Sequence, residues 1–148
     1  MPFALEQLTQ GLSLADAINT QSVTNTSVTS ASIDMTKFRR AMYEIQCGSL
    51  GVAGNVNGNL QSSAQANFNV AHNIASSNIA QITQNNARVT IEIRDDQIQA
   101  GDRYLRLVLT GGGNAVTVGA TGWGSEAEQK PAKANDLGSN YVVQRLVL

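Results

Sequence analysis

The sequence contains few of the side chains on which most catalytic and metal sites depend. Its 148 residues include one cysteine, one histidine and one tryptophan, and only 14% of them are charged, against roughly 25% in an ordinary soluble domain. A single cysteine excludes an intramolecular disulfide bond, and one histidine with one cysteine argues against a structural zinc site. A single histidine also leaves few ways to build a nucleophile–base pair. Composition therefore predicts that the protein is not an enzyme and has no catalytic residues, cofactor or metal.

Charge and hydropathy argue against nucleic acid and membranes as partners. The net charge is -1 and the pI is about 5.7, so there is no basic field to attract nucleic acid. No run of about 18 apolar residues, the length of a membrane-spanning helix, occurs. The start of the chain contains Glu6 and no basic residue, unlike a secretory signal. We therefore expect 1–148 to be the mature chain, assembled in a cytoplasm.

Alternation of apolar and polar residues predicts several short β-strands. The clearest cover 87–94 and 102–110, where apolar side chains recur at every second position. Further strands are expected around 43–47, 54–60, 115–124 and 141–148, separated by turns rich in glycine and polar residues. Such a pattern indicates an all-β protein, either an antiparallel sandwich or a small barrel. The predicted core comprises Tyr43, Ile45, Cys47, Val89, Ile91, Ile93, Leu105, Leu107 and Leu109.

The first 20 residues differ from the rest because their apolar side chains recur without a clean period and are interrupted by Gly11. So many large apolar groups would be a liability on a free tail. We therefore predict an N-terminal arm over 1–20 that docks on a partner, followed by a β-sandwich domain over 21–148; a frayed terminus is the alternative. For 20–33, the threonine and valine content favours a strand over disorder. The predicted interaction residues of the arm are Phe3, Leu5, Leu8, Leu12, Leu14 and Ile18.

The motifs that suggest a phosphate, calcium or catalytic site are better explained as turns, caps and surface positions. The run Gly111-Gly-Gly-Asn lacks the Lys-Ser/Thr of a P-loop and is typical of a hairpin turn. Asp95, Asp96 and Asp102 do not have the spacing of a calcium loop, which favours roles in turns and caps. His72 has no carboxylate near it in the sequence, so we expect it at the surface or in an interface.

The chain also contains a long stretch without formal charge. No Lys, Arg, Asp or Glu occurs between Glu44 and Arg88, which indicates that this stretch faces other subunits or a neutral pocket. Phe68 lies within it and is a possible interface residue. Trp123, flanked by glycines, is interpreted as an anchor in a sheet or interface, with a sugar-stacking platform as the alternative.

The order of four segments resembles a known family. They are 33–45, 89–97, 100–110 and 116–120; the first contains Asp34-Met-Thr-Lys-Phe-Arg-Arg and the third Gly101-Asp-Arg-Tyr-Leu-Arg. This order is similar to that of small structural proteins of tailed bacteriophages, the capsid cement or decoration proteins. The resemblance covers 33–120, and its motifs are strand-and-turn patterns without catalytic groups. The chain departs from the family around 61–86, where it keeps only Gln61-Ser of a polar hairpin and has Phe68 at a comparable place.

The resemblance implies a jelly-roll-like sandwich that binds the major capsid protein on the outside of a virion, often as a homotrimer. The expected function is therefore a non-enzymatic capsid cement subunit, assembled in the cytoplasm of a host bacterium. A head–tail connector, tail or fibre-associated subunit is the first alternative. A carbohydrate-binding module that uses Trp123 is the second.

Overall fold

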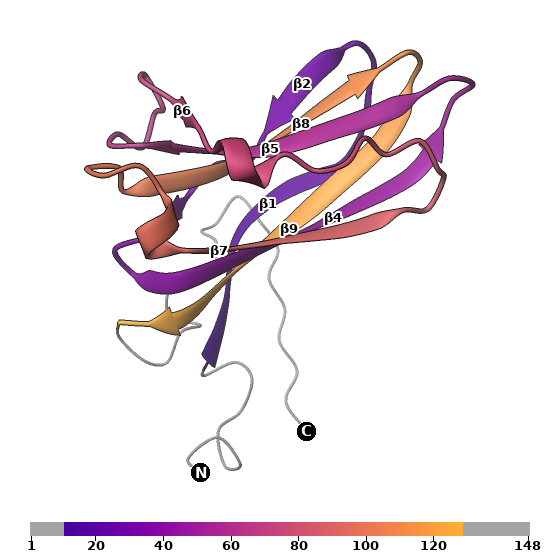
Figure 1. The fold of residues 1–148 in the computed structure, drawn as a ribbon. Helices are drawn as coiled ribbons and strands as arrows, with labels where there is room; N and C mark the ends of the chain where they lie inside the picture. Colours follow the sequence, from indigo (N-terminus) through magenta and orange to yellow (C-terminus); the bar gives the residue numbers. More distant parts are fainter. Residues whose placement is uncertain (1–10, 129–148) are drawn as a thin grey trace, which may run out of the picture.

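The computed structural model describes residues 11–128, which form two antiparallel β-sheets packed face to face (Figure 1). Sheet A has the strand order β1-β9-β4-β7, and sheet B the order β2-β8-β5-β6 with β3 also paired to β8. The strands of sheet A are β1 (Leu12–Val23), β9 (Val116–Ala127), β4 (Phe38–Leu50) and β7 (Arg88–Arg94). Those of sheet B are β2 (Thr26–Thr29), β3 (Ile33–Asp34), β8 (Tyr104–Gly112), β5 (Asn55–Ser63) and β6 (His72–Asn73). Two short 3₁₀ turns, η2 (Ala75–Ser77) and η3 (Asp95–Gln97), complete the described elements.

The pairing of the strands is nested. β1 pairs with β9, β2 and β3 pair with β8, β4 pairs with β7, and β5 pairs with β6, all antiparallel. The chain alternates between the two sheets as this long hairpin is wound up, which is the connectivity of a double-sheet jelly roll. The predicted all-β sandwich is therefore confirmed. Among residues 11–128 there is no helix long and apolar enough to cross a membrane.

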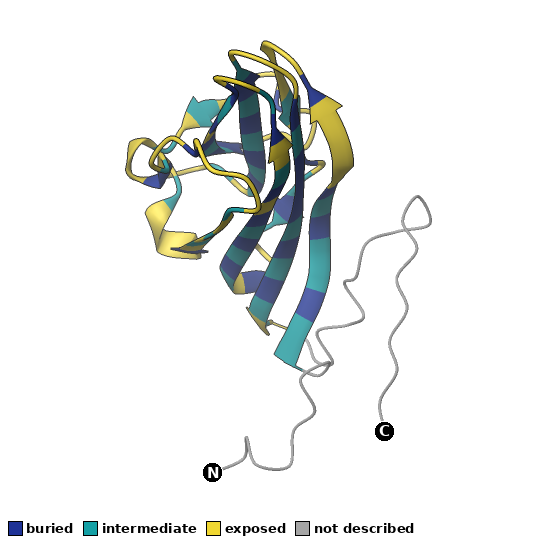
Figure 2. Ribbon diagram, turned by 90° about the vertical axis from the view of Figure 1, so that its right-hand side faces the viewer, coloured by how far each residue is buried: buried dark blue, intermediate teal, exposed yellow. Residues whose placement is uncertain are grey.

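The core lies between the sheets, and burial alternates along each central strand (Figure 2). All nine predicted core residues face it. Tyr43, Ile45, Leu105 and Leu107 are fully buried, whereas Val89 and Ile91 are only partly buried because β7 is the outermost strand of sheet A. Cys47 is a small core residue, as predicted.

Close packing across the core explains the glycines of β9. A Cβ atom on Gly122 would lie 2.7 Å from Tyr43 Cε1, and one on Gly124 would lie 2.6 Å from the ring of Phe38. Such distances are far inside van der Waals contact, so the aromatic rings occupy the space that side chains would take. The predicted small-residue strand at 115–124 is thus the strand on which the two largest core rings rest.

The predicted boundary at residue 20 falls inside a strand. Leu12–Val23 form β1, in which Ile18 is buried in the core and Leu12 and Leu14 are half-buried. Residues 20–33 do not form one strand, because the chain turns at Asn25, whose φ is 49°, and continues as β2 and β3. Of the predicted arm, Phe3, Leu5 and Leu8 lie outside the described residues.

The uncharged stretch closes one open side of the sandwich. After β6 the chain runs along the outer edge of β5, where the amides of Ile74, Ile79 and Ile82 donate to the carbonyl oxygens of Leu60, Gly58 and Val56. The three isoleucine side chains pack against the core, and the segment then crosses to β7 (Figure 1). The backbone of this segment thus satisfies the edge of β5, while its isoleucine side chains cover the core.

Replacing Leu107 with alanine should lower the free energy of unfolding by about 2–5 kcal/mol, because a fully buried side chain would leave a cavity. Urea unfolding at neutral pH measures the change. Val52→Ala is the matched control, since Val52 is 89% exposed and its loss should cost under about 0.5 kcal/mol. A cooperative melt of Leu107→Asp would contradict the assigned strand phase.

Candidate interaction surfaces

A buried carboxylate holds the two sheets together. The Tyr43 hydroxyl of β4 donates to Asp16 Oδ2 of β1 at 2.5 Å, and the amides of Ala17 and Ala31 donate to Oδ1 at 2.9 and 3.0 Å. Burial raises the pKa of Asp16, although its hydrogen bonds oppose the rise. Burial and the neighbouring Asp16 charge raise the pKa of Tyr43, so the phenol keeps its proton and remains a donor. Both carboxylate oxygens of Asp16 and the Tyr43 hydroxyl take part in hydrogen bonds within the fold, which gives this cluster a structural role.

Ser30 extends this cluster into sheet B. Its hydroxyl lies 3.4 Å from the Tyr43 hydroxyl and accepts from the Leu107 amide at 2.9 Å. Its own amide donates to the Leu107 carbonyl oxygen at 3.0 Å. Ser30, in the link between β2 and β3, therefore contacts Tyr43 of sheet A and bonds to Leu107 of sheet B.

A bidentate ion pair joins two of the segments on which the family resemblance rests. Arg103 donates from Nε to Asp34 Oδ1 at 2.9 Å and from a terminal nitrogen to Oδ2 at 2.6 Å. The hydroxyl and amide of Thr36 also donate to Oδ1. The arginine hydrogen bonds are the main cause that lowers the pKa of Asp34 to about 2. This contact fixes β3 against the start of β8, so the motifs at 33–45 and 100–110 form one spatial unit.

His72 lies at the surface with its side chain 34% exposed, and it has a carboxylate partner that is remote in the sequence. Its Nδ1 lies 2.8 Å from Asp102 Oδ2, and the Ser62 hydroxyl donates to the same oxygen at 2.6 Å. The signal was hidden because Asp102 is 30 residues away and is brought near by the pairing of β5 with β6 and β8. Serine and histidine both bond to the aspartate rather than to each other, so the trio lacks the order of a nucleophile–base–acid relay. It fastens β6 to the start of β8.

The other two aspartates singled out by the sequence lie in a turn. Asp95 and Asp96 begin η3 directly after β7, and Asp96 pairs with Arg94 at 3.2 Å. Within residues 11–128, no group of three or more His, Cys, Asp or Glu side chains is placed to hold a metal ion.

The outer face of sheet B is polar, and the charges on it are bonded within the chain. Side chains on neighbouring strands form ladders: Ser27 bonds to Thr110 at 2.7 Å, and Asn73 accepts from Asn59 and Gln61. At the β3 end of the face, Asp34 is paired with Arg103. We call this surface the sheet B face; it comprises Ser27, Thr29, Asp34, Asn57, Asn59, Gln61, Asn73, Tyr104, Arg106, Val108 and Thr110.

Phe68, a predicted interface residue, lies at the sheet B face but is buried. It has a φ of 53° and is 7% exposed. The Arg106 guanidinium stacks on its ring at 4.3 Å from the centroid and donates twice to Gln61 Oε1. Burial lowers the pKa of Arg106. The ring of Phe68 and the amide of Gln61 thus hold the Arg106 guanidinium against the sheet B face.

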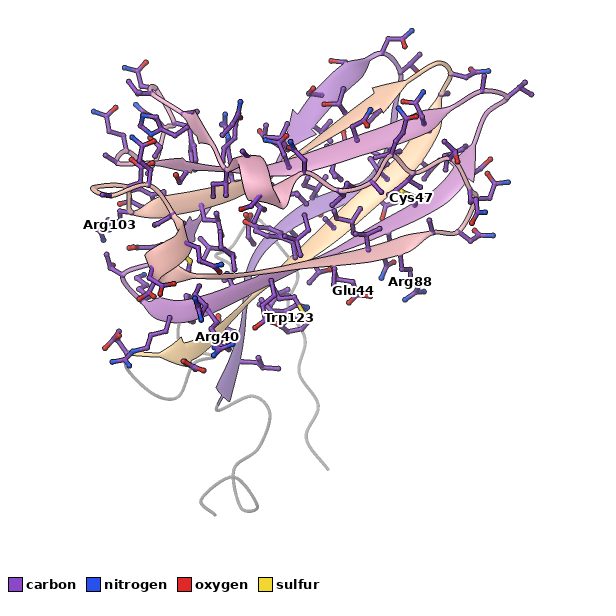
Figure 3. All side chains as sticks on the ribbon, viewed as in Figure 1. Arg40, Glu44, Cys47, Arg88, Arg103 and Trp123 are labelled. Carbon is purple, nitrogen blue, oxygen red and sulfur yellow. The ribbon has the colours of Figure 1, made fainter. Side chains whose placement is uncertain are left out.

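Trp123 lies on the opposite side of the molecule, on the face of sheet A that points away from sheet B (Figure 3). Strand register places it between Leu14 of β1 and Met42 of β4, followed by Glu92 of β7. Around this row the charges are paired: Arg40 with Glu92 and Glu126, and Glu44 with Arg88. The structure therefore separates the two predicted interface residues, Phe68 and Trp123, onto different faces.

A cavity of about 260 Å³ lies at one end of sheet A. Hydroxyl and amide groups line it together with Arg88 and Cys47. Burial raises the pKa of the Cys47 thiol, which keeps it protonated and poorly nucleophilic.

The Asp34–Arg103 pair predicts a dependence of stability on acid. The folded pKa of about 2 lies below the unfolded value of 3.8, so the pair stabilises the fold fully above pH 3.8 and is lost as the pH falls through about 2. Asp34→Asn should lower the free energy of unfolding at pH 7 by about 1–2 kcal/mol, with Arg103 half exposed. The loss should shrink toward pH 2. Asp96→Asn, at an exposed pair, should change it by under about 0.5 kcal/mol; equal effects of both variants in urea titrations would contradict the assignment.

Comparison with known proteins identifies no family. No family model matches the chain, and no curated protein matches it. Among solved structures, the chain is similar to one from infectious bursal disease virus, Gt strain, at 10% identity and a TM-score of 0.45. A second similarity is to the Gx strain of the same virus, at 13% identity and a TM-score of 0.35. Each alignment covers 82% of this chain but only 33% and 32% of the viral chains.

Proposed function

We propose that this protein is a non-enzymatic structural component of a virion, a cement or decoration subunit that binds the major capsid protein of a tailed phage from outside. The observation that carries the proposal is the sheet B face. It offers mainly amides and hydroxyls, and its charges are satisfied within the chain: Arg106 is stacked on Phe68 and bonded to Gln61, and Asp34 is paired with Arg103. A face without unpaired charge suits repeated packing of identical subunits, where like charges would repel.

The residues that carry the family resemblance support this proposal. Asp34 and Arg103 lie 69 positions apart in the sequence, yet they bond directly, and Ile33 pairs with Leu105 beside them. In this chain the two motifs therefore form one contacting unit rather than two separate short patterns. The jelly roll itself serves viral capsid domains, lectins and enzymes alike, so the fold alone does not decide the function.

The proposed capsid contact is the part of the chain that precedes β1. Because β1 begins at Leu12, we restrict the docking arm to 1–10, with Phe3, Leu5 and Leu8 as its apolar anchors. Ten extended residues span up to about 35 Å, enough to reach a neighbouring subunit. Leu12, Leu14 and Ile18 act within or beside β1 instead.

Several weak contacts repeated over a shell act together through effective concentration. A homotrimer fits this role because closed cyclic assemblies match the three-fold positions of a capsid lattice. In the proposed trimer the sheet B face is the contact between copies, and the arms extend to the capsid.

Deleting residues 1–10 should leave β1 and the sandwich folded but weaken binding to stripped capsids by at least about tenfold. The measurement is binding of the purified protein to phage particles whose native cement protein has been removed, with circular dichroism to confirm the fold. Alanine at Phe3, Leu5 and Leu8 together should reproduce the deletion, whereas Thr9→Ala should not. Full occupancy by the deleted protein would refute the arm as the capsid contact.

Introducing charge into the sheet B face should disrupt self-association. Asn57 is exposed on β5, so Asn57→Asp would place an unpaired carboxylate in each interface of the trimer and weaken the trimer by about tenfold or more. Asn19→Asp makes the same chemical change at an exposed position in sheet A and should leave the trimer intact. Sedimentation equilibrium distinguishes them; a stable monomer of the unmodified chain, or equal effects of both variants, would exclude this interface.

A further inference from the structure

The face of sheet A that surrounds Trp123 has the chemistry of a covered surface. Trp123 and Met42 are half-buried neighbours across β9 and β4. The charges beside them are paired within the face, with three carboxylates to two arginines: Arg40 bonds to Glu92 at 3.1 Å and to Glu126 at 2.9 Å, and Arg88 lies 3.6 Å from Glu44. An apolar centre with a paired, polar rim is the usual composition of a buried contact.

The end of the chain supplies a segment that needs such a contact. Residues 141–148 read Tyr-Val-Val-Gln-Arg-Leu-Val-Leu. Apolar side chains occupy both alternating sets of positions, which is typical of a strand or strap buried on both sides. Left in water, this segment has the composition of an aggregation-prone strand.

The connection between the two is short enough for the segment to reach the face of its own chain. β9 ends at Ala127 beside Phe38, and Glu128 is held by the Lys37 carbonyl oxygen at 2.9 Å and by Arg39 at 3.2 Å. Trp123 precedes Glu128 by five positions, about 17 Å along a strand. The twelve residues 129–140 span up to about 40 Å, so the chain can return over the face.

We propose that residues 141–148 of the same chain dock on the outer face of sheet A and cover Trp123 and Met42. A tether of this length gives an effective concentration near millimolar, which favours the chain's own segment over that of a second copy. Arg145, the one charged side chain in the segment, meets a rim that contains Glu44 and Glu92. The inference concerns the single chain and does not rest on the proposed function.

Trp123 is the one tryptophan in the protein, so its fluorescence reports on this face alone. A chain that ends at Asn140 should show a red-shifted emission maximum and at least about twofold stronger quenching by acrylamide, because the indole gains water contact. The far-ultraviolet circular dichroism should still show a folded β protein. Unchanged emission and quenching in the folded, truncated chain would overturn the proposal.

Substitutions in the full chain keep the test valid if truncation impairs folding. Leu146→Asp combined with Val143→Asp should reproduce the red shift, whereas Ala132→Asp combined with Ala134→Asp adds the same charge in the connecting segment and should not. The emission of the unmodified protein should not change on about hundredfold dilution through the micromolar range, because the contact is intramolecular. A red shift on dilution would assign the covering segment to another copy and refute the proposal as stated.

Discussion

The hydrogen bond between the Tyr43 hydroxyl and the Asp16 carboxylate is the contact on which the rest of the sandwich depends. It lies between the sheets, where an unpaired carboxylate would be costly, so β1, β4 and the crossing at Ala31 must all be in place before the group is satisfied. Ser30 carries the network on to β8 through Leu107. Gly122 belongs to the same arrangement, because a side chain there would occupy the space of the Tyr43 ring. Apolar burial drives the collapse, and this polar cluster selects one register among those that burial alone would permit.

The sequence predicts best the strands in which one face is buried without interruption. β7 and β8 alternate along their whole length, so the inward phase of Ile93, Leu105 and Leu107 could be assigned from periodicity. β1 could not, because its pairing with β9 shifts between Leu14 and Asp16 and again between Ile18 and Gln21. Each bulge reverses which side chains face inward, and the apolar residues then appear without a period. In the sequence alone, this edge strand of sheet A therefore resembles the second half of a docking arm.

Side-chain contacts on the surfaces are harder to predict than the strands, because the two residues of each contact are far apart in the sequence. His72 and Asp102 meet only after β6 and β8 have both paired with β5, and Asp34 meets Arg103 only after β3 has paired with β8. Phe68 shows a different limit: a left-handed backbone conformation, unusual for an aromatic residue, turns its ring under Arg106 and removes it from the exposed surface. The uncharged stretch is visible in the composition, and it contributes Asn57, Asn59, Gln61 and Asn73 to the sheet B face as well as the segment along the edge of β5.

The two faces show how a chain with few charges can select its partners. On sheet A, Arg40 and Arg88 bond to carboxylates of neighbouring strands, and Arg39 and Arg94 bond to carboxylates just beyond the strand ends, so the paired charges leave little field beyond the sheet. On sheet B, Arg106 is stacked and bonded, Asp34 is paired with Arg103, and the other side chains of the face are mainly amides and hydroxyls. Without a long-range field, association gains little electrostatic steering and depends on the fit of surfaces at contact. Such recognition is slow and weak for a single pair of molecules, but it becomes effective where copies are already held side by side, because each contact then forms at high effective concentration.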